Sequence, residues 1–144
     1  NIINTQILNQ ANELKNIQKK NNLKDLNIML VLSMQPSSII VAGNNTSGNS
    51  FIKMLGAKNI FDSFEGWKSV SKESIIKKNP DYILIPEKNL HKNSEVEKLS
   101  EDLMFKNTNA GKKGNFIFED GMAMLGFGPR TILSALKIAK IINE

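Results

Sequence analysis

The first twenty residues repeat apolar side chains with the period of a helix. The apolar positions recur at intervals of four, four, three and three residues, at Ile3, Ile7, Ala11, Leu14 and Ile17. This spacing places them along one stripe, and the segment contains neither glycine nor proline. Residues 2–20 are therefore predicted to form one amphipathic helix.

Farther along the chain, short apolar runs alternate with segments that have helix-capping signals. Buried strands are predicted at Ile28–Leu32, Ile39–Ala42, Tyr82–Ile85 and Phe116–Phe118, with a short edge strand at Asn59–Phe61. Helices are predicted from a Thr46 or Ser47 cap to Leu55, at Lys72–Lys78 after a Ser71 cap, at Glu95–Leu103 and at Pro129–Ile142. We expect Phe64–Lys68 and Lys106–Gly114 to be loops. The alternation favours an α/β fold with a parallel sheet and helices on both faces.

The composition and charge of the chain exclude several classes of protein and site. The 144 residues suit one domain, and the net charge of +5 is spread over lysine doublets without interleaved aromatic residues, so we expect no nucleic-acid surface. The chain has no cysteine, which excludes disulfides and thiolate metal sites. No apolar run approaches the roughly 18 residues of a membrane span. Because the chain opens at Asn1 inside a helical pattern, without an initiator Met or a signal peptide, we expect a piece of a larger protein.

Signals for catalysis, metal binding and nucleotide binding are weak. The single histidine, His91, stands in a polar stretch without a carboxylate at a suggestive spacing, and we interpret it as a surface residue. No cluster of metal-ligating side chains and no nucleophile elbow are present. Gly126-x-Gly128 lacks the third glycine of a dinucleotide fingerprint, and Gly43–Gly48 lacks the lysine of a P-loop. The chain is therefore not expected to be an enzyme.

Arg130 is the only arginine among nineteen basic residues, and it lies in the predicted first turn of the last helix. Gly128 is the expected cap, with Pro129 at the first helical position. The loops predicted at the carboxyl ends of the strands, where ligands of open α/β sheets bind, are Ser33–Ser38, Gly43–Gly48, Pro86–His91 and Glu119–Arg130. A guanidinium there can bind an anion, or it can pair with a nearby carboxylate.

Large apolar residues occur in or beside the same predicted loops. They are Met34, Trp67, Met122, Met124 and Phe127. Taken singly, a Met or Phe in a loop more often packs in the core than contacts a ligand. Together with Arg130 and free backbone donors, they indicate a site for a broad apolar molecule that carries carboxylates. Heme, with its porphyrin plane and two propionates, fits this description.

These segments resemble the C-terminal lobe of periplasmic hemin-binding proteins, the substrate-binding components of heme ABC importers. The matching segments are Met29–Met34, Ala42–Thr46, Phe64–Ser71 with Glu73, Pro80–Pro86 and Leu125–Thr131. The most specific of them is Leu125–Thr131, which reads LGFGPRT. The resemblance implies a class III periplasmic binding protein lobe, Rossmann-like and three-layered, with a mainly parallel central sheet. Residues 1–22 would be the later part of the helix that connects two lobes, residues 23–144 the C-terminal lobe, and the N-terminal lobe would be absent.

The resemblance also implies a function and roles for particular residues. A non-enzymatic protein outside the cytoplasm would capture heme between its lobes and deliver it to the permease, meeting the membrane only there or through a lost lipid anchor. Arg130, with the backbone of Gly128 and Thr131, would face the heme, and Glu73 would dock on the permease. The iron ligand would be a tyrosine of the missing lobe, not Tyr82, so this chain would hold no metal ligand.

Three alternatives to heme stay open at this point. Two keep the same architecture and replace heme with a siderophore or a corrinoid. The third is a small cytoplasmic α/β domain that binds nucleotides or regulates another protein. Trp67, where the family often has tyrosine, and the segment Gln35–Ser38, where it tends to glycine, depart from the family pattern.

Overall fold

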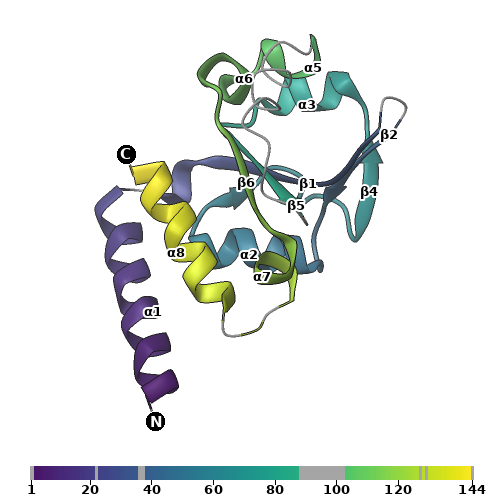
Figure 1. Ribbon diagram of the computed structural model, residues 1–144. Coiled ribbons are helices and arrows are strands. Elements are labelled where there is room, and N and C mark those ends of the chain that lie inside the picture. Colours follow the sequence, from purple (N-terminus) through teal and green to yellow (C-terminus); the bar gives the residue numbers. More distant parts are fainter. Residues whose placement is uncertain are drawn as a thin grey trace.

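The computed structural model describes residues 2–21, 23–35, 38–87, 103–126, 128 and 130–143. Its helices, labelled in Figure 1, are α1 (Ile2–Asn21), the short 3₁₀ turn η1 (Leu23–Asp25), α2 (Ser47–Leu55), α3 (Lys72–Lys78), α5 (Leu103–Lys106), α6 (Asn109–Lys113), α7 (Gly121–Leu125) and α8 (Arg130–Asn143). Its strands are β1 (Asn27–Gln35), β2 (Ser38–Ala42), β3 (Lys58–Asn59), β4 (Trp67–Val70), β5 (Tyr82–Glu87) and β6 (Phe116–Asp120).

The described strands form one sheet in the order β4-β2-β1-β5-β6, with β3 beside the start of β1. β1 runs parallel to β3 and to β5, and β5 runs parallel to β6. β2 is antiparallel to both β1 and β4, so these strands add an antiparallel edge to a parallel centre. The mainly parallel sheet predicted from the sequence is confirmed.

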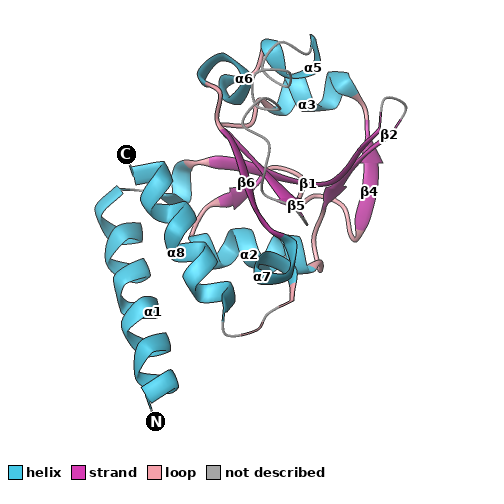
Figure 2. Cartoon of the chain, in the orientation of Figure 1, coloured by secondary structure: helices cyan, strands magenta, loops and turns pink. Residues whose placement is uncertain are grey.

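Helices cover both faces of the sheet, as Figure 2 shows. Side chains of a strand point to alternate faces, and β1 buries one set on each side. Ile28 and Leu30 belong to the core cluster that includes residues of α2, α7 and α8, with α1 packed against α8. Met29 and Val31 belong to the second cluster, which includes residues of α3, α5 and α6. The fold is therefore a three-layer α/β lobe, as predicted.

Several helix ends follow the signals in the sequence. The Thr46 hydroxyl accepts a hydrogen bond from the Asn49 N–H at 3.0 Å and caps α2. The Ser71 hydroxyl accepts one from the Ser74 N–H at 3.1 Å and caps α3. Gly56 ends α2 with φ = 83°, a conformation that favours glycine.

Some local predictions were wrong, and each error involves a short element. Trp67 and Lys68, predicted in a loop, lie in β4, because the edge of β2 supplies hydrogen-bond partners for their backbone. The turn-rich segment Lys106–Gly114 contains α6, which Thr108 caps. The predicted helix Glu95–Leu103 falls almost wholly outside the described residues. Among the helices that are described, none combines the length and hydropathy needed to cross a membrane.

Candidate functional site

An apolar pocket of about 590 Å³ opens at the carboxyl ends of β1, β5 and β6. Its described lining residues are Leu32, Pro86, Asp120, Gly121, Met122, Leu125 and Gly126. Leu32 is 47% exposed and Met122 is 70% exposed, although both are large apolar side chains. This end of an open α/β sheet is where ligands bind, so the exposed apolar surface marks a candidate ligand face.

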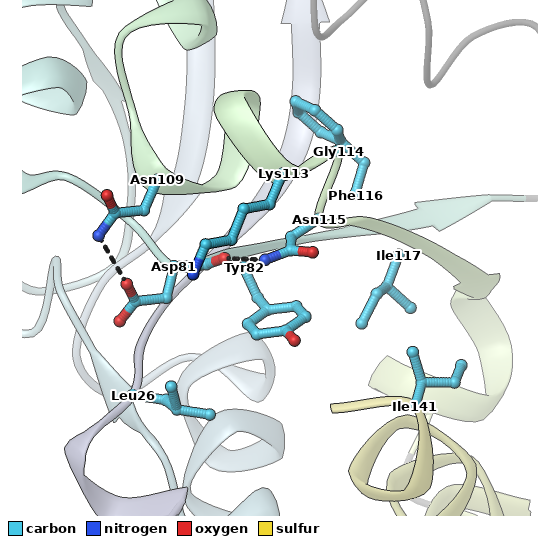
Figure 3. Close-up of a pocket in the computed structure, with 10 residues that line it drawn as sticks. All are labelled: Leu26, Asp81, Tyr82, Asn109, Lys113, Gly114, Asn115, Phe116, Ile117 and Ile141. Atoms are coloured by element: carbon cyan, nitrogen blue, oxygen red, sulfur yellow. Dashed lines mark hydrogen bonds between the residues drawn. The ribbon is translucent and has the colours of Figure 1, made fainter. Parts of the chain in front are cut away.

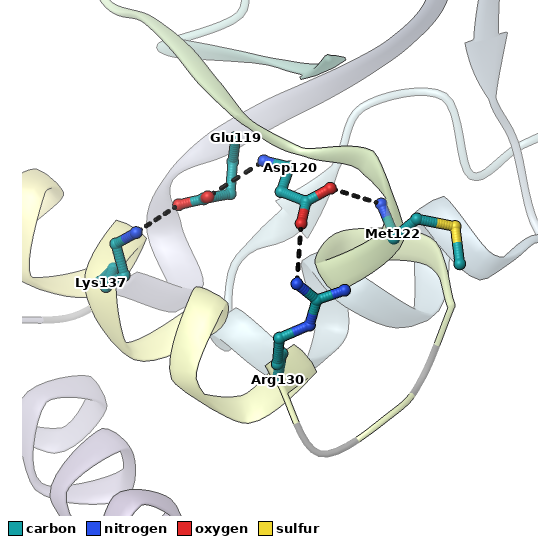
Figure 4. Close-up of polar contacts among 5 residues, drawn as sticks. All are labelled: Glu119, Asp120, Met122, Arg130 and Lys137. Atoms are coloured by element: carbon teal, nitrogen blue, oxygen red, sulfur yellow. Dashed lines mark hydrogen bonds and ion pairs between the residues drawn. The ribbon is translucent and has the colours of Figure 1, made fainter. Parts of the chain in front are cut away.

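Arg130 begins α8, and Figure 4 shows its side chain directed at Asp120, which lines this pocket. Its Nη1 lies 3.3 Å from Oδ2 of Asp120, and the two side chains are 67% and 34% exposed. Of the two roles open for this arginine, pairing with a local carboxylate is therefore present in the structure. An exposed pair of this kind is worth only about 0–1 kcal/mol, and a guanidinium has further donors for another anion.

Two consecutive carboxylates at the end of β6 hold this part of the site in place. The buried Glu119 accepts a hydrogen bond from the Asp120 N–H at 3.0 Å and pairs with Nζ of Lys137 at 3.3 Å. Oδ1 of Asp120 accepts a hydrogen bond from the Met122 N–H at 3.0 Å and so caps α7. Strand β6 is thereby tied to α7 and α8. Sequence reasoning missed both carboxylates, although an acidic pair at the end of a strand was a usable signal.

Two predicted ligand residues turn their side chains into the protein. Met124 is 0% exposed within the core cluster, because residues two apart on a helix face nearly opposite sides and Met122 takes the outer one. Thr131 is 2% exposed, so its side chain does not reach the pocket, while its N–H donates to the Gly128 carbonyl at 3.0 Å. The buried Met124 side chain therefore does not line the pocket as predicted. Thr131 was predicted to act through its backbone, and that prediction is not affected by the burial of its side chain. Gly128 is exposed and precedes α8.

The remaining apolar candidates do not line the described part of the pocket. Trp67 lies on β4 opposite Ala42 and packs partly against the core. Its ring is so close to Gly48 that a Cβ atom added to this glycine would lie 3.0 Å from the ring. The predicted rim loop Gly43–Gly48 leaves β2 in the opposite direction, because β2 is antiparallel to β1. Met34 lies in β1 opposite Ile39. Its side chain and the whole of Phe127 lie outside the described residues.

Glu73 lies in the first turn of α3, as the capping pattern predicts. It is exposed, and no ion pair involves it within the described part of the chain. A carboxylate in a first turn is stabilised by the helix dipole, by roughly 0.3–1 kcal/mol, and this needs no partner.

A second pocket, of about 460 Å³, lies at the opposite end of the sheet (Figure 3). Several polar groups in and beside it hydrogen-bond to one another. Oδ1 of Asp81 accepts from the Asn109 amide at 3.0 Å, Oδ2 accepts from the Asn27 N–H at 2.9 Å, and the Asn115 amide donates to the Asp81 carbonyl. Burial, and then the charge of Asp81, raise the pKa of Tyr82 above its ordinary 10.0.

Other chemistries have little support in the described residues. Gly126 follows α7 and not a strand, so the strand–glycine–helix context of a dinucleotide fingerprint is missing. Within the described ranges no three His, Cys, Asp or Glu side chains are grouped to hold a metal ion. His91 lies outside the described residues.

Comparisons with known proteins agree with this fold. The periplasmic heme-binding protein HutB of Vibrio cholerae superposes with a TM-score of 0.77 at 27% identity, over 91% of this chain and 52% of that one. A possible iron-binding, periplasmic solute-binding protein of Staphylococcus epidermidis gives 0.76 at 29% identity, over 97% and 55%. The catecholate-siderophore binding protein VctP of Vibrio cholerae gives 0.71 at 20% identity, over 96% and 52%, which shows the fold alone.

The chain thus spans about half the length of these solved structures. Comparison of the sequence with curated proteins gives no match. The sequence model described as periplasmic binding protein matches residues 4–121, most of the chain. With its three-layer lobe and an apolar pocket at the carboxyl ends of the strands, the chain belongs to the periplasmic binding protein family.

Proposed function

We propose that this chain is the C-terminal lobe of an extracytoplasmic protein that binds heme and delivers it to an ABC importer. The observation that carries the proposal is one juxtaposition. The exposed apolar side chains of Leu32 and Met122 lie at the same end of the sheet as the exposed guanidinium of Arg130. Heme combines a flat apolar ring with two carboxylates, so it complements both parts of this face. HutB, at 27% identity, is a heme-binding protein with the same lobe.

Each part of this face would supply a different share of the binding energy. Covering Leu32 and Met122 removes apolar surface from water, and full burial of such a side chain is worth about 1.5–3 kcal/mol. Because both residues are already partly covered, the two together would contribute about 2–3 kcal/mol. A charge-assisted hydrogen bond from Arg130 to a propionate would add about 1.5–3 kcal/mol.

The second lobe would supply the rest of the site. Residues 1–22 would form the later part of the helix that connects the lobes, and residues 23–144 the C-terminal lobe. The half-length coverage of the solved structures supports this division. The iron ligand would lie on the N-terminal lobe, since Tyr82 is at the far end of the sheet from the proposed heme face.

Docking on the permease would involve Glu73. Its exposed position in the first turn of α3 leaves the carboxylate accessible to an arginine of a membrane partner. Replacing Glu73 with glutamine should lower the rate of heme uptake by cells and leave hemin binding in solution unchanged. Unchanged uptake would favour the purely helix-stabilising role.

The ligand assignment can be tested in the full-length two-lobe protein. Hemin, a ferric catecholate siderophore and a corrinoid are titrated separately, the first by its Soret band and the others by tryptophan fluorescence. We expect hemin to bind most tightly, and Arg130→Ala to weaken it about 10- to 150-fold, the factor that corresponds to 1.5–3 kcal/mol. Arg130→Lys keeps the charge and loses the planar fork, so its affinity for hemin should lie between those of the unchanged protein and of Arg130→Ala.

A siderophore is the second candidate, since VctP shares the fold. Tight binding of the siderophore without a Soret change for hemin would replace heme with that ligand.

A further inference from the structure

Asp120 serves two groups at once at the mouth of the apolar pocket (Figure 4). Its Oδ1 accepts the Met122 N–H at 3.0 Å and caps α7, which carries the exposed methionine of the ligand face. Its Oδ2 lies 3.3 Å from Nη1 of Arg130. The hydrogen bond from the Met122 N–H fixes the carboxylate in place. Oδ2 therefore faces Arg130 from a fixed position.

The charges around Arg130 are balanced before any ligand arrives. The buried Glu119 is matched by Lys137 at 3.3 Å, and Asp120 is matched by Arg130. Lys137 therefore does not neutralise Asp120, and within the described residues Arg130 is the only cation in an ion pair with it. A ligand carboxylate that reaches Arg130 must share it with Asp120 or displace it.

The contact between Asp120 and Arg130 is of a kind that a ligand can displace. It joins a single nitrogen to a single oxygen at 3.3 Å, with 67% of the arginine side chain open to solvent. An exposed pair of this kind would lower the affinity of a competing ligand carboxylate by about two- to fivefold at most. A ligand carboxylate that engages the guanidinium by two parallel hydrogen bonds is held more strongly.

We propose that Asp120 is a specificity-determining residue that competes with the ligand's carboxylate for Arg130. The proposal rests on the function proposed above. In the empty lobe Asp120 holds the guanidinium at the pocket mouth. In the loaded lobe the ligand's carboxylate takes the place of Asp120 at the guanidinium. Asp120 thereby limits the affinity for an anionic ligand and favours its release, while a ligand without carboxylates is unaffected.

The test replaces Asp120 with asparagine in the full-length two-lobe protein. Asparagine caps helices as well as aspartate does, so α7 and the pocket should keep their shape. Asp25→Asn is the matched control, because Asp25 is an exposed aspartate in η1 at the other end of β1. Dissociation constants for hemin and for hemin dimethyl ester, whose carboxylates are blocked, are measured by Soret titration at low and high salt.

We expect Asp120→Asn to bind hemin about two- to fivefold more tightly at low salt and to bind the dimethyl ester as the unchanged protein does. High salt should shrink the gain, and Asp25→Asn should alter neither ligand. In an Arg130→Ala background the Asp120 substitution should no longer tighten hemin binding, since no guanidinium is left to release.

Equal or weaker hemin binding by Asp120→Asn would overturn the proposal, as would an equal gain for hemin and its ester. Loss of the gain in the Arg130→Ala background supports it, and persistence of the gain there contradicts it. If the unchanged protein gives no Soret change with hemin, the heme function itself fails, and the competition inferred here fails with it.

Discussion

Met122 and Met124 allow one sharp prediction, because they lie on the same helix, α7, with opposite exposure. Met122 is 70% exposed and Met124 is 0% exposed. Full burial of a methionine is worth about 1.5–3 kcal/mol, so a ligand that covers the open part of Met122 gains about 1–2 kcal/mol. Met122→Ala should therefore weaken hemin binding about 5- to 30-fold, while the free energy of unfolding changes by less than about 0.5 kcal/mol.

Met124→Ala is the matched comparison. It removes the same atoms from a packed core, and such a change costs about 2–5 kcal/mol of stability. Urea unfolding followed by the single tryptophan, Trp67, measures the stability of both variants, and Soret titration of the full-length protein measures hemin binding. The reasoning is refuted if Met122→Ala lowers stability by more than about 1 kcal/mol. It is also refuted if Met122→Ala leaves hemin affinity unchanged.

Three further predictions concern other parts of the lobe. Asn59→Ala should destabilise the chain by about 2–4 kcal/mol in urea, because the buried amide bonds to the Ala42 carbonyl, Asn49 and the Phe61 N–H; a loss below about 1 kcal/mol would contradict this. Thr131→Val should raise the free energy of unfolding by about 1 kcal/mol without changing hemin affinity, because the buried hydroxyl has no hydrogen-bond partner among the described residues; weaker hemin binding would indicate that this hydroxyl contacts the ligand. The raised pKa of Tyr82 favours the folded state fully below pH 10.0, and this stability should disappear as pH rises through the folded-state pKa. In a pH titration followed at the tyrosinate absorbance band, the midpoint should lie at higher pH for the folded chain than for the urea-unfolded chain. Equal midpoints would refute the shift.

The strands and the longer helices could be predicted because their signals are local. The run Ile28–Val31 is apolar on both faces, as a strand between two helix layers requires, and the caps at Thr46 and Ser71 are formed by the residues themselves. The direction of β2 was a missed inference, because the residues between the two predicted strands are too few for the crossover that parallel strands need. The apolar run alone does not give a direction, but its short connection to β1 requires the antiparallel pairing that the structure has.

The candidate site was predicted only in part, for a related reason. Arg130 stood out by residue type, and its place at the start of a helix followed from the sequence around it. Met122 and Met124 could not be told apart, because α7 is too short to show a helical period, so which one faces outward was not readable. Asp120 was missed because its importance comes from Arg130, ten residues later, and from the turn that brings them together.

A crystal structure of the full-length protein with hemin would test the account most directly. It should place the porphyrin against Leu32 and Met122, with a propionate bonded to the Arg130 guanidinium and the iron bound by a residue of the N-terminal lobe. Heme seated instead in the pocket beside Tyr82, or held in the cleft with Arg130 still paired to Asp120 and turned away from both propionates, would contradict it.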